Sequence, residues 1–231
     1  MIKNKSILAI IPARGGSKGL PGKNIIDIDG KPLFSYTYEQ AKKSKYIDRI
    51  ILSSDDNEII EVAKNLGCEV PFKRPKNLAL DTSGTMPVIF HALDQLSQDY
   101  DYVVILQVTS PLRLSQDIDK CIELCEQDKM PACVSVAEVD KPLQWVFSLD
   151  KDHKLKSVIS DLKLPIRRQD ATQHYAVNGA VYVAKVEWLI SQEHFITDET
   201  VAHIMPKSRS IDIDAEADLV LFEYFLRKLK E

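Results

Sequence analysis

Several features that mark particular classes of protein are scarce or missing in this sequence of 231 residues. Basic residues are not in excess, because 30 Lys and Arg stand against 34 Asp and Glu, and the net charge is −4. Without a basic stripe, the sequence predicts no nucleic-acid partner and no membrane surface. The first apolar run, residues 7–12, is too short for a signal peptide or a membrane span. We therefore expect a cytoplasmic protein.

Cysteine is also scarce. The sequence has four, and they show no C-x-x-C spacing and no neighbouring histidine pattern: Cys68, Cys121, Cys125 and Cys133. A zinc site is therefore not predicted. We expect four free, buried thiols in a reducing compartment.

Apolar segments alternate with amphipathic ones along most of the chain. Strands are predicted at 6–12, 49–54, 102–107 and 132–137, with helices between them at 32–43, 58–66, 88–96 and 116–126. Strand character returns at 178–184 and 203–205, and a C-terminal helix is predicted over 215–230. This rhythm predicts an α/β fold of the Rossmann-like kind, a mostly parallel sheet with helices on both faces.

The rhythm breaks between residues 138 and 176. This stretch is polar, with scattered apolar positions that could not bury much of a core alone. We interpret residues 1–231 as a single domain and 138–176 as a small protruding arm that makes a dimer contact.

A basic, glycine-rich loop follows the first predicted strand. It carries Arg14, Lys18 and Lys23 among four glycines, with Ser17 and Asn24 beside them. Ligands of open α/β sheets bind at the carboxyl ends of strands, and glycines let backbone N–H groups approach an anion closely. The loop therefore predicts a polyphosphate site; the alternative is a solvated turn. It is neither the nucleotide P-loop nor the dinucleotide fingerprint.

The loop closely resembles the signature of the N-acylneuraminate cytidylyltransferases, the family that makes CMP-sialic acids. Further segments in the same order extend the resemblance over nearly the whole chain: Arg74-Pro75 with Asp81-Thr82-Ser83, Leu106–Arg113, Arg168-Gln169, Asn178-Gly179-Ala180 and Ser210–Asp214. Val108 stands where the third motif usually has proline. The resemblance implies a nucleotidyltransferase fold that acts as a homodimer.

Asp212 and Asp214 are two residues apart in a β-type run, so both carboxylates should point to one face. Two hard oxygen ligands there suit Mg²⁺, with phosphate oxygens and water completing the octahedron. The alternative is that Asp214 caps the C-terminal helix and Asp212 is a loop acid, and both can hold.

The resemblance assigns the other positions. It places Asn24 near the ribose, and Arg74, Ser83 and Thr85 around the cytosine. It places Gln107, Arg168, Tyr182 and Phe195 along the sugar pocket, with Thr109 and Ser110 in the same motif. The alternatives are a surface charge for Arg74, helix caps for Ser83 and Thr85, and core aromatics for Tyr182 and Phe195.

Two positions depart from the family pattern. Relatives often carry a basic residue where this chain has Gln144, and an arginine where it has Ala176. These departures leave the nucleotide half intact and leave the sugar open, with legionaminic acid and other nine-carbon acids as candidates.

The implied reaction is CTP plus a sialic-acid-type nonulosonic acid giving CMP-sugar and pyrophosphate. Arg14, Lys18 and Lys23 would hold the triphosphate, and Asp212 and Asp214 would hold Mg²⁺, with Asp212 also a candidate for proton transfer through water. The alternatives are a CMP-Kdo-type cytidylyltransferase and a non-catalytic CTP- or sugar-binding regulator on the same fold.

Overall fold

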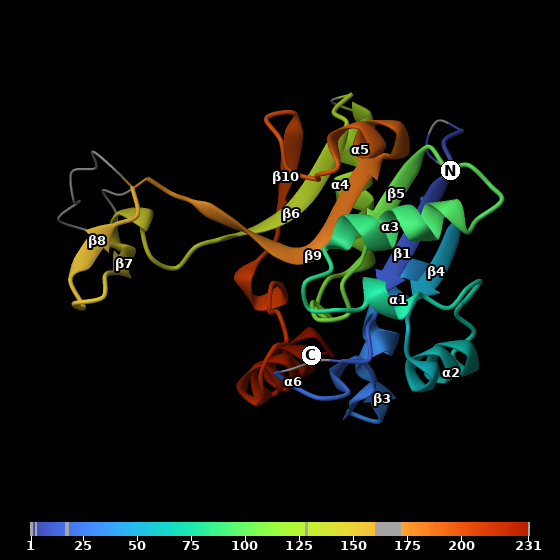
Figure 1. The fold of residues 1–231 in the computed structure, drawn as a ribbon, viewed down its shortest axis with the longest axis horizontal. Helices are drawn as coiled ribbons and strands as arrows, with labels where there is room; N and C mark the ends of the chain where they lie inside the picture. The colour runs from blue at the N-terminus through green and yellow to red at the C-terminus, as the bar shows by residue number, and fades with distance from the viewer. Residues whose placement is uncertain (1, 3, 17–18, 128, 160–171, 231) are drawn as a thin grey trace.

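The chain folds into an α/β body from which a hairpin extends to one side (Figure 1). The computed structural model describes residues 2, 4–16, 19–127, 129–159 and 172–230. In this part of the chain, no helix is long and apolar enough to cross a membrane.

The core is a six-stranded sheet of order β10-β6-β9-β5-β1-β4. Strands β1, β4, β5, β6 and β10 are mutually parallel, and β9 runs antiparallel between β5 and β6. The bounds are β1 Ile7–Pro12, β4 Arg49–Ser53, β5 Tyr102–Ile105, β6 Ala132–Glu138, β9 Tyr175–Lys185 and β10 Thr200–Ile204. The predicted mostly parallel α/β sheet is confirmed.

Helices cover both faces of the sheet. Alternate residues of β1 point to opposite sides, because Ile7, Ala9 and Ile11 pack in one apolar cluster and Leu8 and Ile10 in the other. The first cluster receives α1 (Leu33–Lys42), α2 (Asn57–Asn65), α4 (Ser115–Gln127) and α6 (Glu216–Lys230), and the second receives α3 (Thr85–Asp94) and α5 (Val186–Gln192). A strand buried on both faces explains the unbroken apolar run that opens the chain.

The sheet has a topological switch point beside β1. From β1 the chain crosses to β4 on one side, and it later returns to β5 on the other side. The carboxyl ends of β1, β4 and β5 therefore open onto a crevice, which is where α/β sheets bind ligands.

Short elements complete the fold. They are the hairpin β2 (Asp27–Ile28) with β3 (Lys31–Pro32), and the 3₁₀ turns η1 (Lys23–Ile25), η2 (Lys76–Leu78), η3 (Leu143–Trp145) and η5 (Lys207–Arg209). The four cysteines are free and buried, as predicted.

The segment predicted as an arm contains a hairpin of β7 (Phe147–Leu149) and β8 (Leu155–Ser157). Figure 1 shows this hairpin well away from the sheet, joined to it by the chain leaving β6 and entering β9. All residues of both strands are exposed. That it makes a dimer contact stays a prediction.

Some element boundaries differ from the sequence prediction. Helix α5 and strands β7 and β8 were not predicted from the sequence, and α3 begins at Thr85 rather than at 88. Strand β9 is longer than 178–184, and β10 lies at 200–204 rather than 203–205. The segment carrying Asp212 and Asp214 is not a strand.

Candidate active site

A cleft of about 500 Å³ lies at the switch point. It is formed by the loop after β1, the loops around η2 and the start of α3, and the end of β5. Its lining includes the predicted residues Arg14, Lys23, Asn24, Arg74, Ser83, Thr85, Gln107, Thr109 and Asp214. The structure thus brings together residues spread over two hundred positions of the chain.

Arg14 lies in the cleft, paired with a carboxylate. Its guanidinium is 2.7 Å from a carboxylate oxygen of Asp81, and both side chains are partly exposed. The buried Asn24 side chain donates to the Arg14 carbonyl oxygen at 2.9 Å. Asn24 therefore fixes the backbone that carries this cation.

Lys23 joins the opening loop to the segment Asp212–Asp214, called the acidic segment below. Its Nζ donates to Asp214 Oδ1 at 2.8 Å and to the Ile213 carbonyl oxygen at 3.1 Å. Gly19 makes a close backbone approach here, because a Cβ at this position would lie 2.4 Å from the Asp214 carbonyl oxygen. Any larger residue would push the two segments apart.

The acidic segment is held without a strand. Ile213 is fully buried, and its N–H donates to the Thr109 carbonyl oxygen at 2.8 Å. Asp212 and Asp214, on either side, are exposed. The predicted alternation therefore holds, although the predicted β-type run does not form.

Asp214 does not cap the C-terminal helix in the described contacts. That helix begins at Glu216, and the Asp218 carboxylate accepts the N–H groups of Asp214 and Ala215 at 2.9 and 2.8 Å. The alternative reading of Asp214 as a cap is therefore not supported.

The carboxyl group of Asp212 is partly desolvated, although the residue is exposed overall. Burial, followed by repulsion from Asp214, raises its pKa, while a hydrogen bond with Thr109 and the charge of Lys23 oppose the shift. Two carboxylates that repel each other make a favourable site for a divalent cation. Among the described residues, no group of three or more His, Cys, Asp or Glu could hold a metal ion. A metal here would need substrate oxygens and water, which suits Mg²⁺.

Arg74 is almost fully buried in the wall of the cleft rather than being a surface charge. Its guanidinium donates to the Ser53 carbonyl oxygen at 2.6 Å, and its Nε has no hydrogen-bond partner. Burial lowers the pKa of this guanidinium, while the Asp55 charge opposes the shift. A buried donor without a partner is costly.

Ser83 and Thr85 border the cleft at the start of α3. The helix N-cap is Gly84, with no side-chain cap, and the Ser83 hydroxyl donates to the Asn77 carbonyl oxygen at 2.8 Å. The alternative reading of these residues as caps is therefore not supported by the described contacts.

Gln107 lies where the cleft meets two further cavities. One, of about 370 Å³, is mostly apolar and is lined by Tyr182 and Phe195. The other, of about 440 Å³, includes Tyr182 and Asp212. Gln107 and Tyr182 both line the two cavities, so three of the predicted sugar-side residues, Gln107, Tyr182 and Phe195, gather at one end of the cleft.

Tyr182 and Phe195 line a cavity and also pack in the apolar core. The Tyr182 and Phe195 rings are 5.3 Å apart, and Phe195 is buried. Burial, and then the charge of Asp212, raise the pKa of Tyr182, and both residues line the same cavity. Gly179 has φ 74°, and a Cβ there would lie 2.8 Å from Gln107 Oε1.

Thr109 and Ser110 differ in position. Thr109 lines the cleft and holds Ile213 and Asp212. Ser110 is fully buried, and its hydroxyl donates to the Asn178 carbonyl oxygen at 3.2 Å. Ser110 therefore joins the loop after β5 to β9.

Three predicted site residues lie outside the described residues: Ser17, Lys18 and Arg168. Of the two departures from the family pattern, Ala176 lines the cavity that contains Asp212, and Gln144 is buried with its side-chain carbonyl oxygen unpaired.

Three residues with notable contacts had no role predicted from the sequence: Arg113, Asp81 and Asp117. Arg113 is fully buried, and it donates to the carbonyl oxygens of Gln107 and Ala180 and to the Thr37 hydroxyl. Burial lowers the pKa of Arg113 to about 9. Both Arg113 and Asp81 lie in motifs that were noted, so their position was a usable signal; Asp117 had none.

Comparison with known proteins agrees with this geometry. Residues 8–216 match the family described as cytidylyltransferase. The chain is 36% identical to the pseudaminic acid cytidylyltransferase of Campylobacter jejuni, over 92% of each chain. It is 33% identical to the CMP-N,N'-diacetyllegionaminic acid synthase of Legionella pneumophila, covering 97% of this chain and 98% of that one.

Two further comparisons concern length and fold. The N-acylneuraminate cytidylyltransferase of Escherichia coli is 35% identical over 93% of this chain, which spans 51% of that enzyme. Among solved structures, a CMP:2-keto-3-deoxy-manno-octonic acid synthetase complexed with CTP superimposes with a TM-score of 0.72 at 17% identity, covering 97% of this chain and 99% of the other. At this identity the likeness shows the fold alone.

The family match spans the opening loop, the cleft and the acidic segment, and full-length relatives share about a third of the residues. The chain therefore belongs to the cytidylyltransferase family, in its branch of nonulosonic acid enzymes.

Proposed function

We propose that this protein transfers CMP from CTP to a sialic-acid-type nonulosonic acid, with release of pyrophosphate. The observation that carries the proposal is the meeting of three cavities at Gln107. The cleft with the cations offers a place for the nucleotide, and the two smaller cavities offer a place for the sugar beside it. The names of the relatives, which include pseudaminic, neuraminic and legionaminic acid enzymes, support the substrate class.

In this reaction the sugar's anomeric hydroxyl attacks the α-phosphorus, and the bond to the β-phosphate oxygen breaks. Such transfers depend chiefly on positioning and on stabilising charge. Arg14 and Lys23 would bind the triphosphate and the departing pyrophosphate, with Lys18 as a third cation from the same loop. Arg14 would exchange Asp81 for phosphate oxygens as CTP enters.

The base and ribose would occupy the wall opposite the opening loop. Arg74 is suited to the cytosine because it places a guanidinium, a hydrogen-bond donor group, in the wall of the cleft. Ser83 and Thr85 border the same part of the cleft, and Asn24 and Ser17 would lie near the ribose and phosphates. Leu78, Leu80 and Val88 give this wall an apolar surface for the base.

We propose Asp212 and Asp214 as the ligands of Mg²⁺. When bound, the ion would polarise the α-phosphate and lower the pKa of the attacking hydroxyl. Lys23 forms an ion pair with Asp214. When CTP and the metal bind, its Nζ would move toward the phosphates. Asp212, beside Thr109 and Tyr182, is a candidate for accepting the proton through water.

The sugar would lie against Gln107, Thr109, Tyr182 and Phe195. Ser110 would act by holding β9, since its hydroxyl is already used. Arg168 would pair with the sugar carboxylate, because a guanidinium binds a carboxylate in a bidentate and selective manner. We also propose a homodimer formed through the arm and a cytoplasmic location.

Pyrophosphate release tests the function directly. Purified protein with CTP and Mg²⁺ should turn over pseudaminic, legionaminic or neuraminic acid, and other nucleoside triphosphates should give little product. Chelation by EDTA should abolish turnover, and Asp212→Asn should lose most of it.

The same assay, extended to Kdo as acceptor, also distinguishes the alternative functions. Turnover with Kdo, an eight-carbon acid, and none with nine-carbon acids would favour a CMP-Kdo enzyme. Binding of CTP without any turnover would favour a regulator. Full activity in EDTA would refute the metal site and leave the transferase assignment standing.

A further inference from the structure

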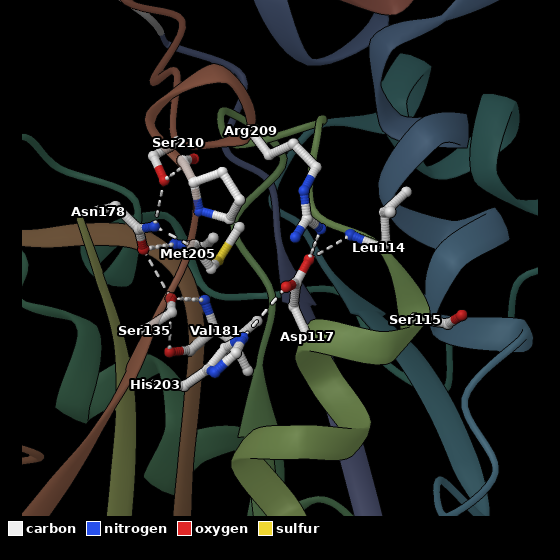
Figure 2. Close-up of polar contacts among 12 residues, drawn as sticks. Leu114, Ser115, Asp117, Ser135, Asn178, Val181, His203, Met205, Arg209 and Ser210 are labelled. Atoms are coloured by element: carbon white, nitrogen blue, oxygen red, sulfur yellow. Dashed lines mark hydrogen bonds and ion pairs between the residues drawn. The ribbon is translucent and has the colours of Figure 1, made fainter. Parts of the chain in front are cut away.

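A buried carboxylate outside the cleft holds the chain just before the acidic segment. Asp117, in the first turn of α4, has a side chain that is 3% exposed. It accepts the Leu114 N–H at 2.8 Å, His203 Nε2 lies 3.1 Å away, and Arg209 forms an ion pair with it. Figure 2 shows His203 and Arg209 converging on this carboxylate from β10 and η5.

A second anchor lies one residue further along. Asn178 of β9 donates from its side-chain nitrogen to Ser210 Oγ at 2.9 Å, and its Oδ1 accepts from Ser135 Oγ at 2.6 Å (Figure 2). Ser210 in turn donates to the Pro206 carbonyl oxygen at 2.9 Å. Residues 209 and 210 are thus fixed to α4 and to β9 through separate contacts.

We propose that Asp117 and Arg209 are positioning residues that hold the Asp212–Asp214 segment against the loop carrying Thr109. This inference rests on the proposed function, because it assumes that the two carboxylates serve the reaction.

The path from the anchor to the site is short. Arg209 lies three residues before Asp212, and no described helix or strand lies between them. Beyond it, the Ile213 N–H bond to the Thr109 carbonyl oxygen and the buried Ile213 side chain are the next fixed points. Because the chain is held at Arg209 on one side and at Ile213 on the other, Asp212 can move only a short distance from the cavity that it lines.

The carboxylate of Asp117 is suited to this role. Burial alone would raise its pKa, but hydrogen bonds from His203 and the Leu114 N–H, together with Arg209, outweigh burial and hold the pKa below its usual range. It remains an anion that attracts Arg209 in a low-dielectric setting, so the pair is strong and directional.

Arg209→Met tests the inference, with Lys207→Met as a matched control. Lys207 is in the same 3₁₀ turn, and its partners Glu138 and Asp140 lie at the base of the arm. Arg209→Lys retains the charge without the planar fork and should rescue part of the effect. Asp117→Asn is less suitable alone, because Asp117 also accepts the Leu114 N–H at the start of α4.

The first readout is hydrogen exchange of metal-free protein, which requires no activity. Amides 211–214 should exchange at least about tenfold faster in Arg209→Met than in wild type or Lys207→Met. The second readout is the Mg²⁺ concentration for half-maximal turnover, which should rise about 10–100-fold, as for groups that orient metal ligands. The KM for CTP at saturating Mg²⁺ should change much less.

Unchanged exchange at 211–214 in Arg209→Met, or an equal change in Lys207→Met, would overturn the inference. A lower melting temperature with wild-type exchange and wild-type Mg²⁺ dependence would also overturn it, since it would show a structural role only. If Arg209→Met does not fold, the same comparison is made with Arg209→Lys. Absence of turnover in wild type would refute the proposed function, while the exchange measurement would still decide the positioning role.

Discussion

At the scale of single residues, two cations of the opening loop, Arg14 and Lys23, are already paired within the protein. Arg14 contacts Asp81, and Lys23 contacts Asp214, at 2.7 and 2.8 Å. These partners keep two positive charges close together in the cleft without a bound anion. A polyphosphate must displace these partners, so only the surplus of its attraction to the cations over the two broken ion pairs stabilises the bound state.

Lys23→Ala and Arg14→Ala should each lower kcat/KM by about 10²–10³, which corresponds to about 2–4 kcal/mol of lost transition-state stabilisation. Steady-state pyrophosphate release measures this, with circular dichroism as a check of folding. Lys31→Ala is the matched control, because Lys31 forms an exposed pair with Glu39 at 2.6 Å. Wild-type kinetics in both cleft variants would show that the loop is only a turn.

Residue-level predictions from sequence succeeded where a local rule was sufficient. Strand spacing placed Asp212 and Asp214 on the exposed side of Ile213, and the position of the loop after β1 placed Arg14 and Lys23 in the cleft. The partners of these groups could not be predicted in the same way. Arg209 and Asp117 are 92 positions apart, and their pairing depends on how α4 packs beside β10.

At the scale of elements, the start of α4 depends on a single carboxylate. Asp117 accepts the N–H of Leu114, the residue just before the helix, in the manner of a capping box, and it also binds His203 and Arg209. One side chain therefore stabilises a helix terminus and joins it to β10 and η5.

Asp117→Asn should lower the free energy of unfolding by about 2–3 kcal/mol near neutral pH, since hydrogen bonds to a buried charge are lost. The native pKa of Asp117 lies below the ordinary aspartate value of 3.8. Its contribution is therefore fully present above pH 3.8 and is lost as the pH falls through the native pKa. Urea unfolding at several pH values should show the difference between wild type and variant shrinking below pH 3.8. A difference that stays constant down to pH 2 would contradict this account.

Element prediction failed where tertiary context decides. The β-α rhythm predicted β1, β4, β5 and β6 with their helices, because each carries its own periodicity. It could not show that β9 inserts antiparallel between β5 and β6, since buried strands of either direction have similar apolar sequences. The short α5 and the exposed hairpin of β7 and β8 have too few buried residues to leave a pattern.

At the scale of the whole molecule, the arm exposes apolar side chains that the body does not cover. Leu149 and Leu155 are 60% and 66% exposed, and they face each other as a cross-strand pair on the hairpin. Isolated two-stranded hairpins are marginally stable in water. We therefore expect a second copy of the chain to cover this surface and to bring its own arm near the sugar side of the cleft.

The double variant Leu149→Asp with Leu155→Asp should sediment as a monomer at micromolar concentration, whereas wild type should be a dimer. Because the arm joins the body beside the cavity lined by Ala176 and Asp212, kcat/KM for the sugar should fall while the KM for CTP stays near wild type. Val220→Asp is the matched control, since Val220 is 67% exposed on α6, and it should remain dimeric. The prediction is wrong if wild type is already monomeric, or if the double variant is monomeric with unchanged sugar kinetics. Either result would show that the reaction does not depend on a dimer formed through the arm. The cleft and both cavities would then have to work within one chain, with Gln107 as their only common wall among the described residues.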